Sequence, residues 1–175
     1  MNILPALQAG SFVVVLASRA ARDEITHVTA ELALRGPLTI LDGGNRFQAY
    51  RIAHLLRQRT TDVQCVSKRL FVRRAFTCYQ MLTLLENTPA RRQPHLILDL
   101  LATFYDDHVK TPESIRLVEA CLRQIDRLRQ FAPLAVTLGP PLLEERAFLI
   151  ENVCTRADSI FEETITPQEV QQPLF

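Results

Sequence analysis

Two carboxylates stand directly after short apolar runs, which is where chemistry is most easily built into an α/β chain. Asp42 follows the run LTIL at residues 38–41, and Asp99 ends the run HLILD. If both runs are parallel strands, the two side chains meet at the carboxyl edge of one sheet, where such sheets bind ligands. A carboxylate at this place can hold Mg²⁺, as in phosphoryl-transfer sites. Asp42 and Asp99 are therefore the first candidates for a ligand site.

The turn after Asp42 contains Gly43 and Gly44, and Asn45 and Arg46 follow. Two glycines permit a tight turn or a close backbone approach. An ordinary turn from strand to helix, with Asn45 capping the helix, is the simpler interpretation. The alternative is a small anion or ligand held by this turn and Arg46.

Residues 17–24, from Ala17 to Glu24, have the position and length of a phosphate-binding loop after the first apolar run. Such a loop needs glycines that bring backbone N–H groups to the phosphate, followed by a lysine and a serine or threonine. This segment has no glycine, and Asp23 and Glu24 place negative charge where a cation is needed. Arg22 offsets part of that charge. We interpret Asp23 as a helix N-cap and expect the chain neither to bind nor to hydrolyse ATP.

Other catalytic or metal-binding patterns are weak. The four histidines and four cysteines are scattered, and Asp106-Asp107-His108 is a loop tripeptide without further ligands. We expect no metal site, no cofactor and no nucleophilic catalysis. Free thiols suit the cytoplasm, and neither a signal peptide nor a membrane-spanning apolar run is visible.

Short apolar runs alternate with helical patterns along the chain. We expect strands at residues 12–16, 38–41, 63–66, 96–101 and 134–138, an edge strand at 159–162, a helix capped by Thr111 and a helix at 142–152. Continuously apolar strands are typical of parallel sheets covered on both faces. The sequence predicts one domain over residues 1–165, a three-layer, doubly wound, mostly parallel α/β sheet. Residues 13–16, 38–41, 96–99 and 135–138 are its inner neighbours, and residues 166–175 form a loosely ordered tail.

Charge is unevenly distributed although the net charge is only +1. Arginines that could contact an anion or nucleic acid gather in the middle third: Arg46, Arg69, Arg73, Arg74, Arg91 and Arg92. Apolar and aromatic residues stand among them: Leu70, Phe71, Phe76 and Tyr79. Aromatic residues and arginines anchor many protein interfaces, so residues 69–79 predict an association surface. The competing interpretation is that these aromatics belong to the core, and complete burial would favour it.

The same positions carry a resemblance to the RecA/RadA recombinase-type ATPase core, a P-loop NTPase fold, over residues 11–163. LTILDGGNRF resembles that family's strand ending in Asp-Thr-Glu-Gly-x-Phe, and LILDLLATFYDD resembles its Walker B strand. RAFTCYQ, LAVTLGPP and RADSI resemble later segments of the family. The departures fall on function: Gly44 replaces the catalytic glutamate, Leu100 replaces a serine, and Leu138 and Gly139 stand near an Asn-Gln pair. The resemblance therefore implies a RecA-like core with a degenerate nucleotide site.

Three functional hypotheses follow. The first is a non-catalytic RecA-like accessory or adaptor subunit in DNA recombination or repair, paired with a protein partner or with itself. The second is a nucleic-acid-binding module that uses the arginines of the middle third. The third is an enzyme for a small ligand held between the Asp42-Gly43-Gly44 turn and Asp99, which would require a pocket there.

Overall fold

The computed structural model describes residues 3–16, 19–141 and 144–162, with the backbone alone for residues 19–22. These residues form a sheet of six parallel strands in the order β3-β2-β4-β5-β1-β6. The strands are β1 (Phe12–Leu16), β2 (Leu38–Asp42), β3 (Leu70–Arg74), β4 (His95–Leu98), β5 (Leu134–Leu138) and β6 (Ser159–Glu162). The predicted α/β class and parallel sheet are confirmed.

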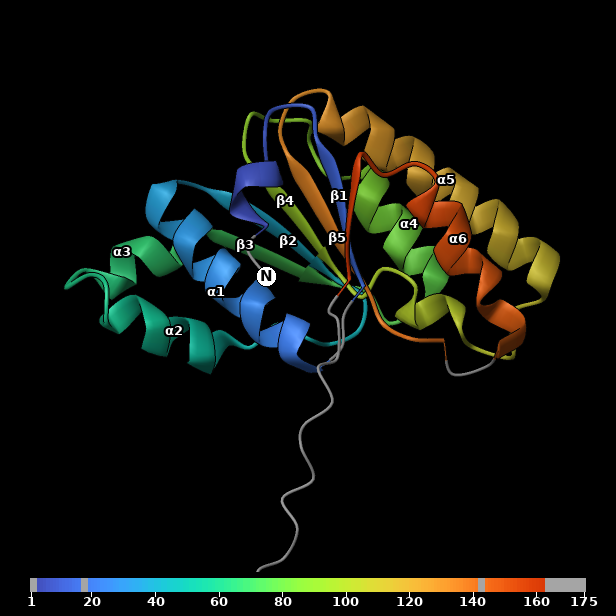
Figure 1. Cartoon of the computed structure of the whole chain (residues 1–175), viewed down its shortest axis with the longest axis horizontal. Coiled ribbons are helices and arrows are strands. Elements are labelled where there is room, and N and C mark those ends of the chain that lie inside the picture. Colours follow the sequence, from blue (N-terminus) through green and yellow to red (C-terminus); the bar gives the residue numbers. More distant parts are fainter. Residues whose placement is uncertain (1–2, 17–18, 142–143, 163–175) are drawn as a thin grey trace, which may run out of the picture.

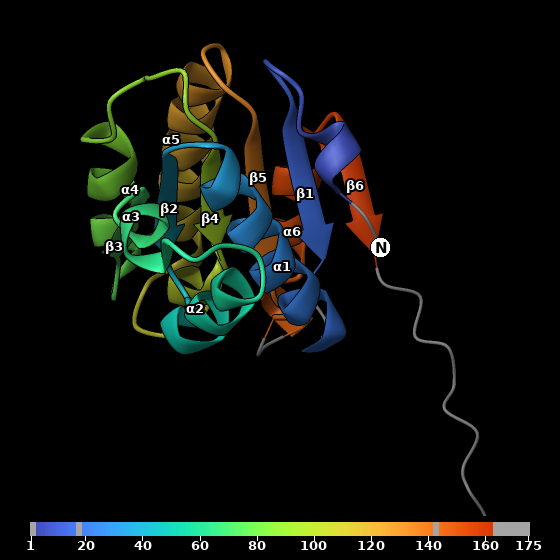
Figure 2. The same ribbon diagram turned by 90° about the vertical axis from the view of Figure 1, so that its left-hand side faces the viewer.

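Helices cover both faces of the sheet (Figures 1 and 2). One face carries α1 (Arg19–Arg35), α2 (Ala49–Arg57) and α3 (Val63–Ser67), and the other carries α4 (Cys78–Glu86), α5 (Thr111–Arg129) and α6 (Phe148–Cys154). Short 3₁₀ turns lie at Leu4–Ala6, Ala102–Phe104 and Glu144–Arg146. None of the described helices is long and apolar enough to cross a membrane.

The four inner strands are buried at nearly every position because both of their faces are covered. Val14, Ile97 and Val136 pack toward α4 and α5, whereas Val13 and Leu96 pack toward α1. The neighbours β2, β4, β5 and β1 are the inner set that the sequence predicts. The edge strand at residues 159–162 is confirmed as β6.

The prediction of a strand at residues 63–66 is wrong, because this segment is the short helix α3. Its N-cap is Asp62, whose side chain accepts a hydrogen bond from the Cys65 N–H at 3.0 Å. The strand instead lies at Leu70–Arg74. As an edge strand with one open face, β3 alternates half-buried with exposed residues and lacks a continuous apolar run.

Three element boundaries also differ from expectation. Lys110, not Thr111, occupies the N-cap of α5, and no side chain caps that end. β4 ends at Leu98 because Asp99 turns the chain with a positive φ of 49°. The last helix begins at Phe148 after the Glu144–Arg146 turn. Residues 142–143 and the predicted tail 166–175 lie outside the described residues.

Candidate functional site

The Asp42 carboxylate organises the turn that follows β2. The side chain is fully buried, and its two oxygens accept hydrogen bonds from the N–H groups of Arg46, at 2.8 Å, and Phe47, at 3.0 Å. The Arg74 guanidinium lies 3.4 Å away. Asn45 sits within this turn at a φ of 54°, and Gln48 is the N-cap of α2, so the prediction that Asn45 caps the helix is wrong. Asp42 thus holds the turn and contacts Arg74.

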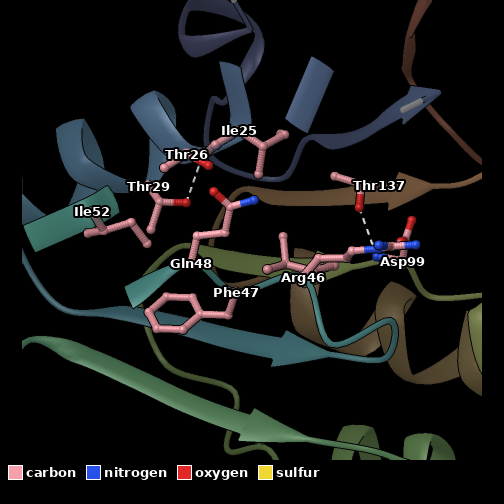
Figure 3. A pocket seen from close by; sticks show the side chains of 10 residues that line it. Ile25, Thr26, Thr29, Arg46, Phe47, Gln48, Ile52, Asp99 and Thr137 are labelled. Carbon is pink, nitrogen blue, oxygen red and sulfur yellow. Dashed lines mark hydrogen bonds and ion pairs between the residues drawn. The ribbon is translucent and has the colours of Figure 1, made fainter. Parts of the chain in front are cut away.

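Asp99 follows β4 directly and lies beside Thr137, a polar residue within the otherwise apolar strand β5. Its N–H donates to Thr137 Oγ1 at 2.8 Å, and its Oδ2 accepts from Arg46 Nε at 2.7 Å (Figure 3). The carboxylate is buried while the arginine side chain remains 45% exposed. Its second oxygen, Oδ1, is buried without a hydrogen-bond partner in the described part of the chain. The chain therefore supplies its own cation to Asp99.

Three of the five glycines pack against Asp99. A Cβ atom on Gly44 would lie 2.5 Å from the Asp99 Cβ, and one on Gly43 would lie 2.8 Å from the Asp99 carbonyl oxygen. On Gly139 it would lie 3.1 Å from Asp99 Oδ1. Contacts below about 3.0 Å force atoms to move. The site is therefore built for glycine at Gly43 and Gly44, and Gly44, where the resemblance places a glutamate, has no space for a side chain in this arrangement.

A pocket of about 20 Å³ lies beside Asp99. Figure 3 shows Arg46, Asp99 and Thr137 at one end and apolar side chains of α1 and α2 at the other. This volume is of the order that holds a single water molecule. The Tyr105 side chain lies near Asp99, and its hydroxyl donates to the Gly139 carbonyl oxygen at 3.2 Å. Burial raises the pKa of Tyr105, and the nearby Asp99 carboxylate raises it further, so this hydroxyl stays protonated.

The segment compared with a phosphate-binding loop is mostly helix. β1 ends at Leu16 and α1 begins at Arg19, so six of the eight residues 17–24 belong to α1. The prediction that Asp23 caps this helix is wrong because Asp23 lies after the helix has begun. Asp23 instead pairs with Arg51 of α2 at 2.5 Å. Glu24 is half-buried, and the side chains of Ala17 and Arg22 lie outside the described residues.

The arginines of the middle third divide into two groups. Arg46 and Arg74 contact the two strand-end carboxylates, and Arg69 donates to the Leu34 carbonyl at the end of α1, at 3.1 Å. Arg73, Arg91 and Arg92 are exposed, and their side chains make no hydrogen bond or ion pair within the described residues. The sequence identified these arginines but could not show which were already engaged.

The aromatic side chains of residues 69–79 reach the surface. Phe71 is 50% exposed, Phe76 73% and Tyr79 52%, whereas Leu70 is half-buried against the core. Phe76 and Tyr79 flank the start of α4, and Phe71 lies near the other end of β3. The core interpretation therefore does not apply to these three aromatics.

Two further polar residues were not singled out from the sequence. Thr137 holds the Asp99 backbone, and its only signal was a hydroxyl within the apolar run LAVTL. His95 is fully buried, and neither ring nitrogen has a hydrogen-bond partner in the described part of the chain. Its burial, reinforced by the positive charge of Arg127 and opposed by the Pro89 backbone, lowers the His95 pKa from 6.5 to about 4.

Histidine, cysteine and acidic side chains are dispersed over the described residues. No group of three or more histidine, cysteine or acidic side chains suited to a metal ion occurs among the described residues. All four cysteines are free thiols, and burial raises the pKa of Cys121 to about 12. Comparison with protein-family models and with curated proteins finds no match to this chain.

Proposed function

We propose that this chain is a non-catalytic RecA-like domain that acts by association, as an accessory or adaptor subunit in DNA recombination or repair. The resemblance supports the family, and the parallel sheet brings its matching segments to one edge. The ends of β1, β2, β4 and β5, and with them Asp42, Asp99 and Gly139, meet at this edge.

The observation that carries the loss of catalysis is the ion pair between Arg46 and Asp99. In the family, the corresponding carboxylate would serve a metal ion and a nucleotide. Here a guanidinium 2.7 Å away neutralises it. A metal ion at Oδ2 would have to displace this cation. Two unit charges of the same sign about 4 Å apart repel by about 4 kcal/mol at an effective dielectric constant near 20, and a divalent ion beside the guanidinium by about twice that.

Two further features of the structure support the proposed loss of ATP binding and hydrolysis. The early start of α1 leaves only two residues between β1 and the helix, too few for a glycine loop that wraps a phosphate. The contact between Gly44 and Asp99 leaves no room for a side chain that would position water. The pocket at Asp99 is about 20 Å³, which is too small for a substrate, so we favour the adaptor hypothesis over an enzyme for a small ligand.

Calorimetric titration of the purified chain with ATP and Mg²⁺, together with a phosphate-release assay, tests the loss of catalysis. We expect no binding in the micromolar range and no release above the buffer rate. The variant Asp99→Ala should behave identically. Micromolar affinity, or turnover that Asp99→Ala abolishes, would refute the proposal.

The association half of the proposal depends on Phe76 and Tyr79, which expose large rings and follow the exposed Arg74 closely in the sequence. Exposed aromatic residues next to arginine are typical anchors of protein interfaces. The partner we propose is a second copy of this chain or a catalytic RecA-type ATPase. Sedimentation velocity should show a complex with one of them that the double variant Phe76→Ser/Tyr79→Ser weakens. A double variant that associates as tightly as the original chain would contradict this surface.

A further inference from the structure

A second recess, unrelated to Asp99, lies along the edge strand β3. Its volume is about 230 Å³, and Thr39 of β2, Phe71 and Arg73 of β3, and Arg91 and Gln93 before β4 contribute to its walls. We call this recess the β3 groove. It arises because successive strand residues face opposite sides of a sheet. Leu70 and Val72 pack toward the side of α1, which leaves Phe71 and Arg73 on the other side, at an edge that α4 does not fully cover.

The β3 groove carries positive charge that nothing in the described chain neutralises. Arg73 and Arg91 both line it and are exposed, and neither side chain makes an ion pair or hydrogen bond with a described residue. Arg92 is exposed directly beside Arg91. Two guanidinium groups in one recess suit a phosphate-bearing ligand, because their planar donors match phosphate oxygens.

The other residues that line the β3 groove suit a nucleic-acid base better than a second anionic group. Phe71 is half-exposed, so its ring offers a flat apolar surface on which a base can stack. The Gln93 side-chain amide donates to Thr39 Oγ1 at 2.5 Å, which leaves the Gln93 carbonyl oxygen as an acceptor. An acceptor suits the amino or imino groups of a base and disfavours a carboxylate.

We propose that the β3 groove binds single-stranded nucleic acid, with phosphates on Arg73 and Arg91 and one base on Phe71. The volume suits about one nucleotide, and the open edge lets the strand continue on either side. The carboxylate side chains of an acidic peptide would satisfy the arginines, but they can neither stack on Phe71 nor donate to the Gln93 carbonyl oxygen. This inference does not rest on the association surface, because Phe76 and Tyr79 do not line the groove.

Fluorescence anisotropy of the full chain with a labelled single-stranded 15-mer tests the proposal. Phe71→Leu keeps the apolar volume and removes the aromatic face, so affinity should fall by roughly 5- to 140-fold, the range of base stacking on aromatic side chains. Arg73→Gln and Arg91→Gln should each weaken binding and lower the slope of log affinity against log salt by about 0.7, the value for one phosphate contact on a single strand.

Matched controls are Tyr50→Leu, which removes a ring that is 79% exposed on α2, and Arg57→Gln, which removes an exposed arginine of the same helix. Both should bind like the unmodified chain, and circular dichroism should show that every variant is folded. Absence of binding at low salt would overturn the proposal. Equal binding of poly-glutamate that Phe71→Leu does not affect would overturn it in favour of an acidic peptide.

Discussion

His95 should make the stability of this protein depend on pH between about 7.5 and 5. The residue begins β4 between Thr39 of β2 and Leu134 of β5, in the face covered by α4 and α5. It is fully buried, and neither ring nitrogen makes a hydrogen bond of normal geometry among the described residues. The Pro89 backbone lies close enough to raise the His95 pKa, but burial outweighs it. Burial, with the charge of Arg127, lowers its pKa from 6.5 to about 4, so the folded protein keeps the ring neutral.

The sign and size of the effect follow from proton linkage. Between about pH 6.5 and pH 4 the unfolded chain protonates this ring while the folded chain does not. The unfolded state therefore binds more protons, and stability falls as the pH falls through this window. For pKa values of 6.5 and about 4, the loss between about pH 7.5 and pH 5 is about 2 kcal/mol. For a chain of this length that loss lowers Tm by about 4–8 °C.

Urea denaturation at the two pH values measures the effect, and His95→Leu removes the titrating ring. We expect the variant to lose about 2 kcal/mol less than the unmodified chain on acidification. The packing cost of the substitution cancels because each protein is compared with itself. The control Leu134→Val lowers stability at both pH values but should retain the full dependence on pH. If His95→Leu loses as much stability on acidification as the unmodified chain, His95 is not the responsible group.

Two further predictions concern the stability of the folded chain, one through close packing at Gly44 and one through buried hydrogen bonds of Arg146. Gly44→Ala should destabilise the protein by about 1–3 kcal/mol in urea denaturation, because the new methyl group meets Asp99 at 2.5 Å. Gly36→Ala meets nothing within 4 Å and should cost nothing or stabilise by up to about 1 kcal/mol; equal effects at the two positions would contradict the close contact. The buried Arg146 donates to the Ser114 hydroxyl at 3.0 Å and to two backbone carbonyl oxygens. Arg146→Met should therefore cost about 2–4 kcal/mol in the same assay, because buried acceptors lose their donor. The exposed control Arg116→Met removes only an ion pair with Glu113 and should cost less than about 1 kcal/mol, and an equal loss for both arginines would count against this reasoning.

The inner strands could be predicted because burial on both faces leaves a continuous apolar run, as in FVVVL for β1. β3 could not be predicted in this way. Its open face allows Arg73 in the strand, while the more apolar residues 63–66 fold as a helix under the cap of Asp62. The apolar content of a strand therefore indicates how far neighbouring elements cover it. An edge strand is covered less and contains fewer apolar residues.

The candidate site was only partly accessible from the sequence. Asp42 and Asp99 could be placed at the sheet edge because each follows a buried strand. The side chains that pair with them could not be identified from the sequence. Arg46 lies 53 residues before Asp99, and the pair forms only when β2 and β4 become neighbours. The contact between Gly44 and Asp99 depends on the same neighbourhood and on the positive φ of Asp99. A sequence shows that a carboxylate can bind a ligand, but the fold decides whether the chain has already supplied one.

The distribution of engaged and unengaged arginines connects the two proposals. At the carboxyl edge of the sheet, Arg46 and Arg74 contact the buried acids Asp99 and Asp42, so the cations there are used internally. On the open face of β3, Arg73 shares a groove with Arg91, and no described acid opposes either one. An uncompensated cation in a recess gains more from an incoming anion than one that must first leave a carboxylate, because separating the existing pair offsets the new attraction. We therefore expect an anionic partner to bind more tightly at the β3 groove than at the carboxyl edge of the sheet, where a parallel sheet ordinarily binds its ligands.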